Sequence, residues 1–413
     1  MFSSFLILQT KNEPSSRIKR FRRAGLGLFL HYGIYSVIGR GEWARKLCPI
    51  GEDEYEAAIG RFTCARLDFD AICKNAFENG FRYVVFTARH HDGFSLYDTE
   101  GISEYSSLNY GPRRDLVGEF VGACKKYGLL PIVYHTTVDW HHPLYQNDFK
   151  GYLGYLRDSV KRLCESYPDI GGFWFDGTWE RHDDWQEDLL YQTIRSRLPE
   201  AIIINNTGLN ELGRTGNPEI DSVTFERGKP KKIDSPNKIL AGEMCDVVNS
   251  HWGIASGDID YKSARYLIES MIDCRRYNCN YLLNVPLEGD GSFSHINLGL
   301  LEQIGAWNRT YPFAMRALCY HDEGKDFFIE LDGEIYLVVF GLGVNGDENV
   351  IKKNGRGKTL TFERFPVRVK EIRYEDNKKE LPFSYEGNRL TIFAENFDYG
   401  SNMIVRIAKV KTE

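Results

Sequence analysis

Short apolar runs recur along most of the chain, and each is followed by polar residues and a helix-length amphipathic segment. Eight such runs occur at residues 26–31, 83–87, 130–135, 172–176, 201–205, 222–226, 240–244 and 281–285. Nearly continuous apolar character is typical of strands buried on both faces, as in a parallel sheet. Helical periodicity occurs between the runs, at residues 69–79, 115–127, 152–167, 184–198 and 261–277. Eight strands that alternate with helices predict an α/β fold of the (β/α)₈ TIM-like barrel type.

The pattern changes after Pro312. Apolar and polar residues alternate at residues 327–331 and 334–340, which the turn Asp332-Gly333 separates, and further runs follow at residues 360–365, 367–374, 389–393 and 403–408. Such alternation is typical of antiparallel strands joined by tight turns. We therefore expect two domains, a catalytic (β/α)₈-like barrel over residues 1–312 and a C-terminal antiparallel β-sandwich with a packing role over residues 313–413.

Composition narrows the classes of function. The 413 residues include 52 Lys and Arg against 58 Asp and Glu, and the net charge of −6 disfavours a nucleic-acid or anionic-membrane partner. No stretch approaches the roughly 18 apolar residues of a membrane span. The nine cysteines are spread singly, and residues 1–10 lack the basic start and cleavage site of a signal peptide. We therefore expect a cytoplasmic protein with reduced thiols.

The residues that follow each apolar run are candidates for chemistry, because the active site of a (β/α)₈ barrel lies at the carboxyl ends of its strands. Six of the ten histidines fall in the first three of these regions. The candidates at the strand ends are His31, His90, His91, Tyr134, His135, His141, His142, Trp174, Asp176, Glu226 and Glu243.

Asp176 is the sharpest of these candidates, because it follows two aromatic residues at the tip of a buried strand and precedes Gly177. Such a carboxylate is desolvated on one side and open on the other, although Asp is also a favoured helix N-cap. Glu226 is the candidate partner of Asp176. Only its position at the end of a predicted barrel strand supports it, since its tetrapeptide Thr-Phe-Glu-Arg recurs at residues 361–364 in the predicted β domain. Glu243 is the fallback. Two carboxylates that face a glycosidic bond can act as nucleophile and acid/base, about 5–5.5 Å apart in a retaining enzyme.

The histidines admit three interpretations. They can be structural, they can bind a metal, or they can bond sugar hydroxyls, since neutral imidazole offers one donor and one acceptor. Metal-dependent barrel hydrolases of the amidohydrolase type place His-x-His on strand one and often Lys on strand four. Here strand one carries only His31 and strand four has no Lys. We favour the sugar interpretation and expect neither metal nor cofactor. Glu42 and Trp43 follow strand one, where an exposed Trp can pack on a sugar face.

At these residues the sequence resembles the α-L-fucosidases of glycoside hydrolase family 29. Residues 29–37 look like that family's opening strand, residues 40–43 its Glu-Trp loop, residues 87–94 its double-His motif and residues 173–177 its nucleophile strand. Residues 252–253, 280–286 and 290–291 resemble late-barrel segments of the family. The matches occur in order over residues 20–310, and a following β domain also suits the family.

The resemblance implies a retaining exo-glycosidase that releases terminal α-L-fucose from a fucosylated oligosaccharide or glycoconjugate through a covalent intermediate. Asp176 would be the nucleophile and Glu226 the acid/base. Arg214 stands twelve residues before Glu226, as an Arg does in some members. Trp43 would lie near the C5 methyl group. The substrate-binding residues would be His31, Glu42, Trp43, His90, His91, Tyr134, His135, Trp174 and Arg214.

Three positions depart from the family pattern. Tyr32 replaces the usual Trp, Ala44 follows Trp43 where an aromatic residue is common, and His135 stands where a Tyr is expected. These changes bear on substrate preference, so a glycosidase for another 6-deoxy or galacto-configured sugar is one alternative. The others are a metal-dependent barrel hydrolase and a glycan-binding protein on a degenerate barrel.

Overall fold

The structure is a computed structural model that describes residues 13–233, 235, 238–351 and 357–413. The segment 1–10, for which the sequence predicts no signal peptide, lies outside the described residues. The chain divides into two compact units. The first extends to Lys262 and includes Cys279–Leu301, and the second comprises Ser263–Asn278 and Glu302–Glu413. The predicted boundary at residue 312 stays a prediction. No helix of the described residues is long and apolar enough to cross a membrane.

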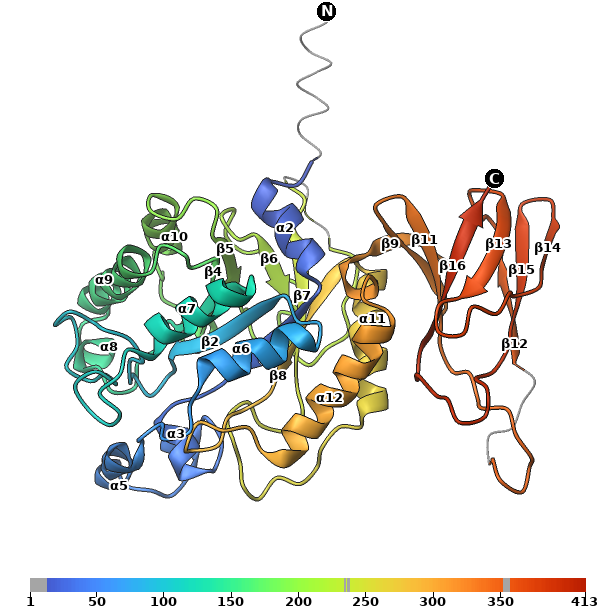
Figure 1. Cartoon of the computed structure of the whole chain (residues 1–413). Helices are drawn as coiled ribbons and strands as arrows, with labels where there is room; N and C mark the ends of the chain where they lie inside the picture. Colours follow the sequence, from blue (N-terminus) through green and yellow to red (C-terminus); the bar gives the residue numbers. More distant parts are fainter. Residues whose placement is uncertain (1–12, 234, 236–237, 352–356) are drawn as a thin grey trace, which may run out of the picture. The chain divides into compact units, whose positions relative to one another are not determined.

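Eight parallel strands of the first unit close into a barrel in sequence order (Figure 1). Pairing of β8 with β1, in the register Leu26 to Tyr281, closes the barrel. The predicted (β/α)₈ barrel is confirmed, and every predicted run contains a strand. The strands are β1 (Leu26–Leu30), β2 (Tyr83–Arg89), β3 (Leu130–Thr136), β4 (Gly172–Asp176), β5 (Ile202–Asn205), β6 (Ser222–Thr224), β7 (Ala241–Val247) and β8 (Cys279–Asn284).

Helices flank the barrel strands, and the five predicted helical segments correspond to α6, α7, α9, α10 and α11. Three of these begin at an Asp whose side chain accepts a backbone N–H, namely Asp68 for α6, Asp115 for α7 and Asp148 for α9. The α-helices are α2 (Ser16–Ala24), α3 (Ile34–Ile38), α4 (Ala44–Leu47), α5 (Glu52–Ala57), α6 (Phe69–Glu78), α7 (Leu116–Tyr127), α8 (Pro143–Asn147), α9 (Phe149–Ser166), α10 (Glu187–Arg195), α11 (Ala264–Arg276) and α12 (His295–Thr310). Short 3₁₀ turns are η1 (Ala58–Arg61), η2 (Thr178–Glu180) and η3 (Ala314–Arg316).

The regular alternation of strand and helix is interrupted around β6. Within the described part of the chain, neither the connection from β5 to β6 nor that from β6 to β7 contains a helix. Three glycines of the first connection, Gly208, Gly213 and Gly216, have positive φ. Glycine adopts this region without a steric cost, whereas a helix requires negative φ. The β5–β6 connection is therefore a long loop.

The second unit contains two antiparallel sheets, in the strand orders β13-β16-β11-β10-β9 and β12-β15-β14. Buried side chains such as Phe328, Leu337, Leu360 and Ile392 form one core from strands of both sheets, so the predicted β-sandwich is confirmed. The sequence did not predict β9 and β14, because β9 lacks alternation of apolar and polar residues and β14, although it alternates, has only four residues. The strands are β9 (Leu318–Asp322), β10 (Phe327–Leu331), β11 (Glu334–Val339), β12 (Lys358–Phe362), β13 (Val369–Tyr374), β14 (Phe383–Glu386), β15 (Arg389–Ala394) and β16 (Arg406–Thr412).

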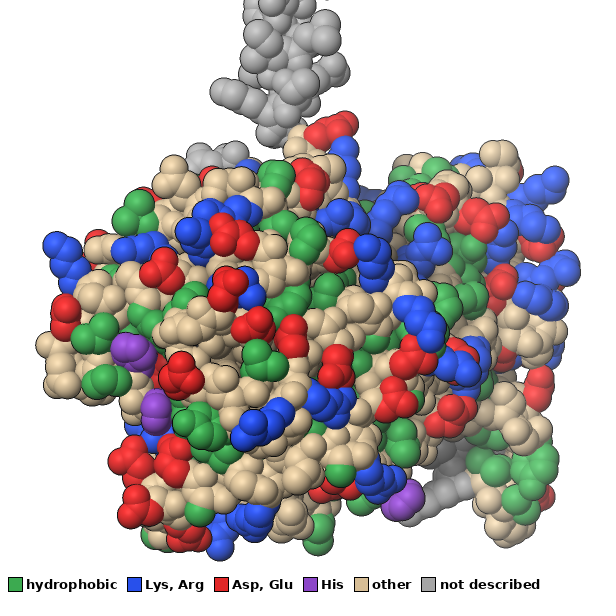
Figure 2. Space-filling model, turned by 60° about the vertical axis from the view of Figure 1, so that its left-hand side comes forward, with side chains coloured by type: hydrophobic (Ala, Val, Ile, Leu, Met, Phe, Trp, Pro, Cys, Tyr) green, Lys and Arg blue, Asp and Glu red, His purple; other side chains and the backbone are tan. Residues whose placement is uncertain are grey.

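Charged side chains of both signs are interspersed over the face shown in Figure 2. Neither the lysines and arginines nor the acidic residues gather there into one large field. Long-range attraction of a polyanion depends on a continuous basic field.

Helix α2 covers the amino ends of the barrel strands. Its Ile18 and Phe21 are buried among the side chains of the barrel interior, where the ring of Phe21 lies 5.1 Å from that of Tyr83. The side-chain amide of Asn280 donates to the backbone carbonyl of Phe21 at 2.7 Å. This end of the barrel is thereby filled, which leaves the carboxyl end for a binding site.

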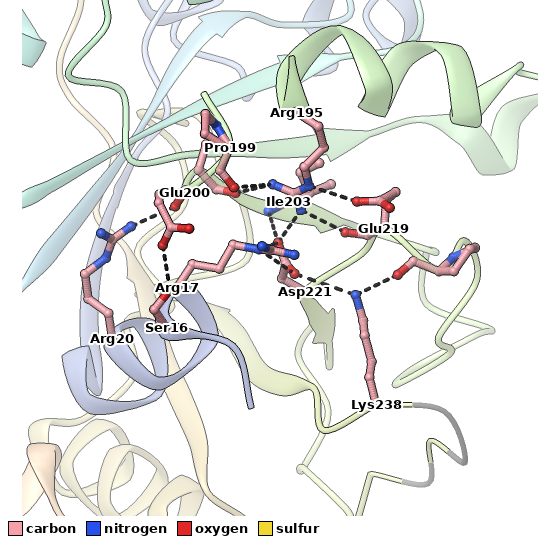
Figure 3. Close-up of polar contacts among 12 residues, drawn as sticks. Ser16, Arg17, Arg20, Arg195, Pro199, Glu200, Ile203, Glu219, Asp221 and Lys238 are labelled. Carbon is pink, nitrogen blue, oxygen red and sulfur yellow. Dashed lines mark hydrogen bonds and ion pairs between the residues drawn. The ribbon is translucent and has the colours of Figure 1, made fainter. Parts of the chain in front are cut away.

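A fully buried carboxylate, Asp221, binds α2 to the start of β6 (Figure 3). Arg17 of α2 donates its Nε to both carboxylate oxygens, at 3.0 and 3.1 Å. Arg195 of α10 donates Nη2 to Oδ2 at 2.6 Å, and Lys238 places Nζ 3.6 Å from Oδ1. The backbone N–H of Ile203 also donates to Oδ2, at 3.1 Å. One carboxylate therefore neutralises cations from three separate segments.

Replacement of Asp221 with alanine should destabilise the barrel, because three cations would lose their common counter-charge. Removal of one partner from a buried ion pair costs about 3–5 kcal/mol, and because the cations here are partly exposed we expect a loss of about 2–3 kcal/mol in the free energy of unfolding. Urea denaturation measures this loss. The control is Asp70→Ala, which removes an exposed pair with Lys126 and should leave the urea midpoint near that of the wild type. Equal midpoints for the two variants would contradict the role of Asp221.

Candidate active site

A cavity of about 1500 Å³ opens at the carboxyl ends of the barrel strands. Its lining includes residues from the ends of β1 to β6 and from the loops that follow them. Ten of the residues that the sequence indicates lie together here. They are His31, Glu42, Trp43, His90, His91, Tyr134, Trp174, Asp176, Arg214 and Glu226.

The turn after β4 exposes Asp176 to this cavity. Asp176 is the last residue of the strand, and Gly177 follows with φ +104°. A Cβ atom on Gly177 would lie 2.6 Å from Cγ2 of Val138, closer than real Cβ atoms approach. The turn therefore requires glycine, both for its left-handed backbone and for space. It leaves the Asp176 carboxylate at the edge of the barrel.

Four side chains surround the carboxylate of Asp176. Oδ1 accepts from Nδ2 of Asn206 at 3.1 Å and from Nε1 of Trp179 at 3.2 Å. Oδ2 accepts from the hydroxyl of Tyr134 at 2.9 Å, and Nε2 of His91 lies 3.4 Å away. Burial alone would raise the pKa of Asp176, but the hydrogen bond and charge of His91 and the donors Tyr134 and Trp179 outweigh it and hold that pKa below its ordinary value. Asp176 is therefore ionised and suited to act as a nucleophile.

Glu226 has the opposite electrostatic environment. It lies two residues beyond β6, and its Oε2 accepts from Nδ2 of Asn206 at 2.8 Å. Burial raises the pKa of Glu226 above its ordinary value, and the negative charge of Asp176 raises it further. One carboxyl group thus favours the anion and the other the protonated acid. Two titratable groups whose pKa values are pushed apart in this way can divide the roles of nucleophile and acid.

A single nitrogen fixes the separation of the two carboxylates. Because both hydrogen bonds end on Nδ2 of Asn206, the bonded oxygens are at most about 6 Å apart, near the roughly 5–5.5 Å of retaining glycosidases and below the roughly 6.5–9.5 Å of inverting ones. Oδ1 of Asn206 accepts from the hydroxyl of Thr224 at 3.0 Å and from the N–H of Gly208 at 3.3 Å. These donors fix the orientation of the amide, so its nitrogen faces the carboxylates.

His31 is held as a neutral imidazole of defined tautomer. Its Nδ1 lies 2.7 Å from Oδ1 of Asn284, whose amide nitrogen donates to the carbonyl of Trp252. The asparagine oxygen must therefore accept, and Nδ1 of His31 carries the proton. Burial lowers the pKa of His31 to about 3. At neutral pH its Nε2 is thus an acceptor for a ligand hydroxyl.

His90 and His91 are adjacent, with ring centroids 4.4 Å apart. The ring of His90 stacks on Tyr134, and its Nδ1 is buried without a hydrogen-bond partner among the described residues. Burial lowers the pKa of His90, and the neighbouring imidazoles His91 and His31 lower it further. Nδ1 of His91 lies 2.6 Å from the hydroxyl of Thr136. No group of three or more His, Cys, Asp or Glu residues in the described chain is arranged to hold a metal ion.

Glu42 and Trp43 bring the loop after β1 to the cavity. Oε2 of Glu42 accepts the backbone N–H groups of Trp252 at 3.1 Å and Gly253 at 2.8 Å, which ties this loop to the loop after β7. Oε1 of Glu42 is left to accept a ligand hydroxyl. The ring of Trp43 stacks on Trp179 at 6.0 Å, so an aromatic wall borders the carboxylates.

The structure does not bring His135 into the cavity. Side chains alternate along a strand, so Tyr134 faces the barrel interior while His135 faces outward, with its ring 6.5 Å from Phe175. Its Nδ1 lies 2.8 Å from the carbonyl of Thr136. The expected substrate contact of His135 therefore has no support in its placement.

Glu243 and Arg214 lie apart from the carboxylate pair. Glu243 is enclosed in the barrel interior, where it accepts from Tyr83 at 2.6 Å and from Nε1 of Trp174 at 2.9 Å. Burial raises the pKa of Glu243 to about 7. It does not line the cavity but supports Trp174, which does. Arg214 lines the outer cavity, where its side chain is mostly exposed and pairs with Glu211 at 3.2 Å.

Sequence reasoning missed Asn206 and Trp179. Both side chains are uncharged, whereas carboxylates and histidines are the residue types that point most directly to acid–base chemistry. Asn206 directly follows β5, so an examination of every strand end would have included it. Trp179 lies in the turn three residues after Asp176, and the sequence pattern does not indicate which of the seven tryptophans are exposed.

Comparison with known proteins identifies a family. A family model described as alpha-L-fucosidase matches residues 8–312. A candidate α-L-fucosidase of Caenorhabditis elegans is 27% identical over 317 residues, which are 68% of this chain and 62% of that protein. The match thus spans less than two thirds of that relative's length.

Solved structures share the fold. The α-L-fucosidase isoenzyme 1 from Paenibacillus thiaminolyticus has a TM-score of 0.81 at 26% identity, over 96% of this chain and 99% of that one. An α-L-fucosidase from Bacteroides thetaiotaomicron, trapped as a covalent intermediate with 2-fluoro-fucosyl fluoride, has a TM-score of 0.81 at 21% identity, over 98% and 97% of the two chains. Since the family model covers most of the sequence, including the whole strand set that carries the cavity, the chain belongs to the α-L-fucosidase family.

Proposed function

We propose that this protein is a retaining exo-glycosidase that hydrolyses terminal α-L-fucosyl linkages in glycans. The observation that carries the proposal is the bridge from one amide nitrogen of Asn206 to both Asp176 and Glu226. It holds an ionised and a protonatable carboxyl group at the spacing of a retaining pair. Membership of the family, and the covalent intermediate trapped in the Bacteroides relative, support fucose as the sugar and a double displacement as the mechanism.

In the first step Asp176 attacks the anomeric carbon of the fucosyl residue. Glu226, protonated because its pKa is raised, donates its proton to the glycosidic oxygen as the bond to the leaving group breaks. The product is an ester between Asp176 and the sugar, with inverted configuration at the anomeric carbon. Esterification removes the charge of Asp176, which lowers the pKa of Glu226 for its second role.

In the second step Glu226 acts as a base. It takes a proton from a water molecule, whose oxygen attacks the anomeric carbon and displaces the Asp176 carboxylate. The second inversion restores the original configuration, and fucose is released. Asn206 binds both carboxylates and therefore keeps them aligned through both steps.

Recognition of the sugar uses imidazole, carboxylate and aromatic groups around Asp176 and Glu226. Nε2 of His31 and Oε1 of Glu42 can each accept a hydroxyl, and His90 and His91 line the same side of the cavity. The apolar C5 methyl group, which distinguishes a 6-deoxy sugar, would pack on the ring of Trp43. This assignment explains why aromatic and imidazole groups surround a site with only two central carboxylates.

We also propose a cytoplasmic location. All nine cysteines lie in the described part of the chain and are free thiols. Reducing compartments favour this state, whereas secreted proteins commonly form disulfides. The fucosylated oligosaccharide or glycoconjugate would then be met inside the cell.

Replacement of Asp176 with alanine should abolish turnover of 4-nitrophenyl α-L-fucoside. Loss of the nucleophile should lower kcat by about 10⁴-fold or more, since no covalent intermediate can form. Release of 4-nitrophenol measures the rate, and circular dichroism checks that the variant is folded. A chelator should leave the wild-type rate unchanged. Near-normal turnover by Asp176→Ala would refute the mechanism, and chelator-sensitive turnover restored by zinc would favour a metal-dependent hydrolase.

Replacement of Glu226 with alanine should slow the first step by about 10²–10⁴-fold with 4-nitrophenyl α-L-fucoside. A 2,4-dinitrophenyl leaving group needs less protonation, so Glu226→Ala should lower the rate less for a substrate that carries it. Azide needs no base to attack the intermediate, so with the 2,4-dinitrophenyl substrate, whose first step needs little acid assistance, it should restore turnover and give fucosyl azide of retained α configuration. Glu243→Gln is the control and should show no azide rescue. Rescue of Glu243→Gln alone would transfer the acid/base role to Glu243.

The dependence of kcat/KM on pH should be bell-shaped. The acid limb should reflect the pKa of Asp176, which lies below the ordinary Asp pKa of about 3.9. The alkaline limb should reflect the pKa of Glu226, which lies above the ordinary Glu pKa of about 4.3. In Asn206→Ala the anions of Asp176 and Glu226 each lose a donor, so both pKa values rise and the profile moves to higher pH. An unchanged profile, or a shift to lower pH, would show that Asn206 does not bind the two carboxylates.

A further inference from the structure

The cavity has more room than the recognition of one sugar ring uses. Its volume of about 1500 Å³ exceeds the roughly 300–1000 Å³ of ordinary small-molecule sites. Four large apolar side chains of its lining are exposed: Leu47 is 73% exposed, Leu209 62%, Leu189 48% and Trp179 39%. A group of exposed apolar residues at the opening of a cavity is typical of a binding surface.

Leu209 lies on the side of the cavity where the leaving group must depart. Its loop begins with Asn206, which donates to Glu226 at 2.8 Å. The glycosidic oxygen receives its proton from the acid/base, so the leaving group occupies the space beside Glu226. Leu209 lies three residues after Asn206 in the same loop and lines the same cavity.

Trp179 lies on the same side of the nucleophile. Its Nε1 donates to Oδ1 of Asp176, the oxygen that also accepts from Asn206, whereas the other oxygen accepts from Tyr134. Gly208 of the β5–β6 loop lies against the ring, since a Cβ on that glycine would be 3.1 Å from Cδ1 of Trp179. Trp179 and the loop that carries Leu209 are thus neighbours.

The exposure of Trp179 is unusual for this chain. All seven tryptophans lie in the described residues, and Trp179 alone among them is exposed. Its ring is nevertheless positioned, because it stacks on Trp43 at an interplanar angle of 17° and donates to Asp176. A positioned aromatic ring that is partly exposed can bind the apolar face of another ring at little cost in conformational entropy.

We propose that Trp179 and Leu209 form a binding surface for the leaving group, and that this surface takes a ring with an apolar face. Such a ring is either the next sugar of a glycan or an aryl group. The inference rests on the proposed function, because it requires a fucoside in the cavity. Trp179 then has two roles, since its N–H holds the nucleophile while its ring binds the departing part of the substrate.

The test compares kcat/KM for three substrates that share the fucosyl group. In α-L-fucosyl fluoride the leaving group is a single atom, which cannot reach the proposed surface. In 4-nitrophenyl α-L-fucoside it is an aryl ring, and in α-L-fucosyl-(1,2)-galactose it is a sugar. Any effect on the nucleophile or on the fucose pocket changes all three values, whereas an effect on the surface changes only the last two.

Leu209→Ala should lower kcat/KM about five-fold for the two substrates that carry a ring and leave the value for the fluoride within two-fold. Trp179→Phe keeps a ring but loses the donor to Asp176, so it should lower all three values by a similar factor. Trp179→Ala loses both the ring and the donor, and kcat/KM for the two substrates that carry a ring should fall about ten-fold further than kcat/KM for the fluoride.

Ile259→Ala is the matched control, because Ile259 is 87% exposed but does not line the cavity. It should change none of the values.

Each outcome decides the question. Losses confined to the disaccharide support the surface and assign it to sugars, and losses confined to the nitrophenyl substrate assign it to aryl groups. Equal losses on all three substrates in both Leu209→Ala and Trp179→Ala, or no loss in either, overturn the inference while the proposed function stands. If the folded wild-type protein hydrolyses none of the three, the proposed function fails, and the inference fails with it.

Discussion

The hydrogen bonds of one side-chain amide determine the geometry of this site. Nδ2 of Asn206 donates to Asp176 and to Glu226, and Thr224 fixes the orientation of that amide from the other side. The three strand ends involved are neighbours in the closed barrel, β4, β5 and β6. Barrel closure therefore supplies the proximity, and the amide supplies the precise spacing that a retaining pair needs. Burial and then the charge of Asp176 raise the pKa of Glu226, whereas the donors around Asp176 outweigh its burial and lower its pKa.

Features with a strong local signal could be predicted from the sequence. Strands buried on both faces give continuous apolar runs, so all eight barrel strands were recognisable, as was Asp176 at the tip of β4. Sequence position also led to Glu226, which the structure places beside Asp176 through their common donor. The strands β9 and β14, by contrast, were not predicted, because β9 does not alternate and β14 is only four residues long.

Features that depend on contacts between distant segments could not be predicted. Whether Glu226 or Glu243 approaches Asp176 depends on where each lies relative to the barrel wall, and both follow plausible strands. His135 was assigned to the substrate because it lies near the end of a predicted strand, but alternation along that strand places Tyr134 toward the barrel interior and His135 outward. The position of Asn206 directly after β5 could be predicted, but its role arises only where the ends of β4, β5 and β6 meet.

The ion cluster of Asp221 has a consequence for the opposite end of the barrel. β6 has only three residues, the shortest strand of the barrel, and the described chain has no helix on either side of it. The main lateral support of this segment is therefore its pairing with β5 and β7, and its longitudinal position is set by the cations that bind Asp221. Glu226 is only five residues further along an extended backbone. The position of Glu226 is thus linked to the ion cluster at the closed end of the barrel, and substitution of Arg17 or Arg195 in that cluster can displace Glu226 without any change at the cavity itself.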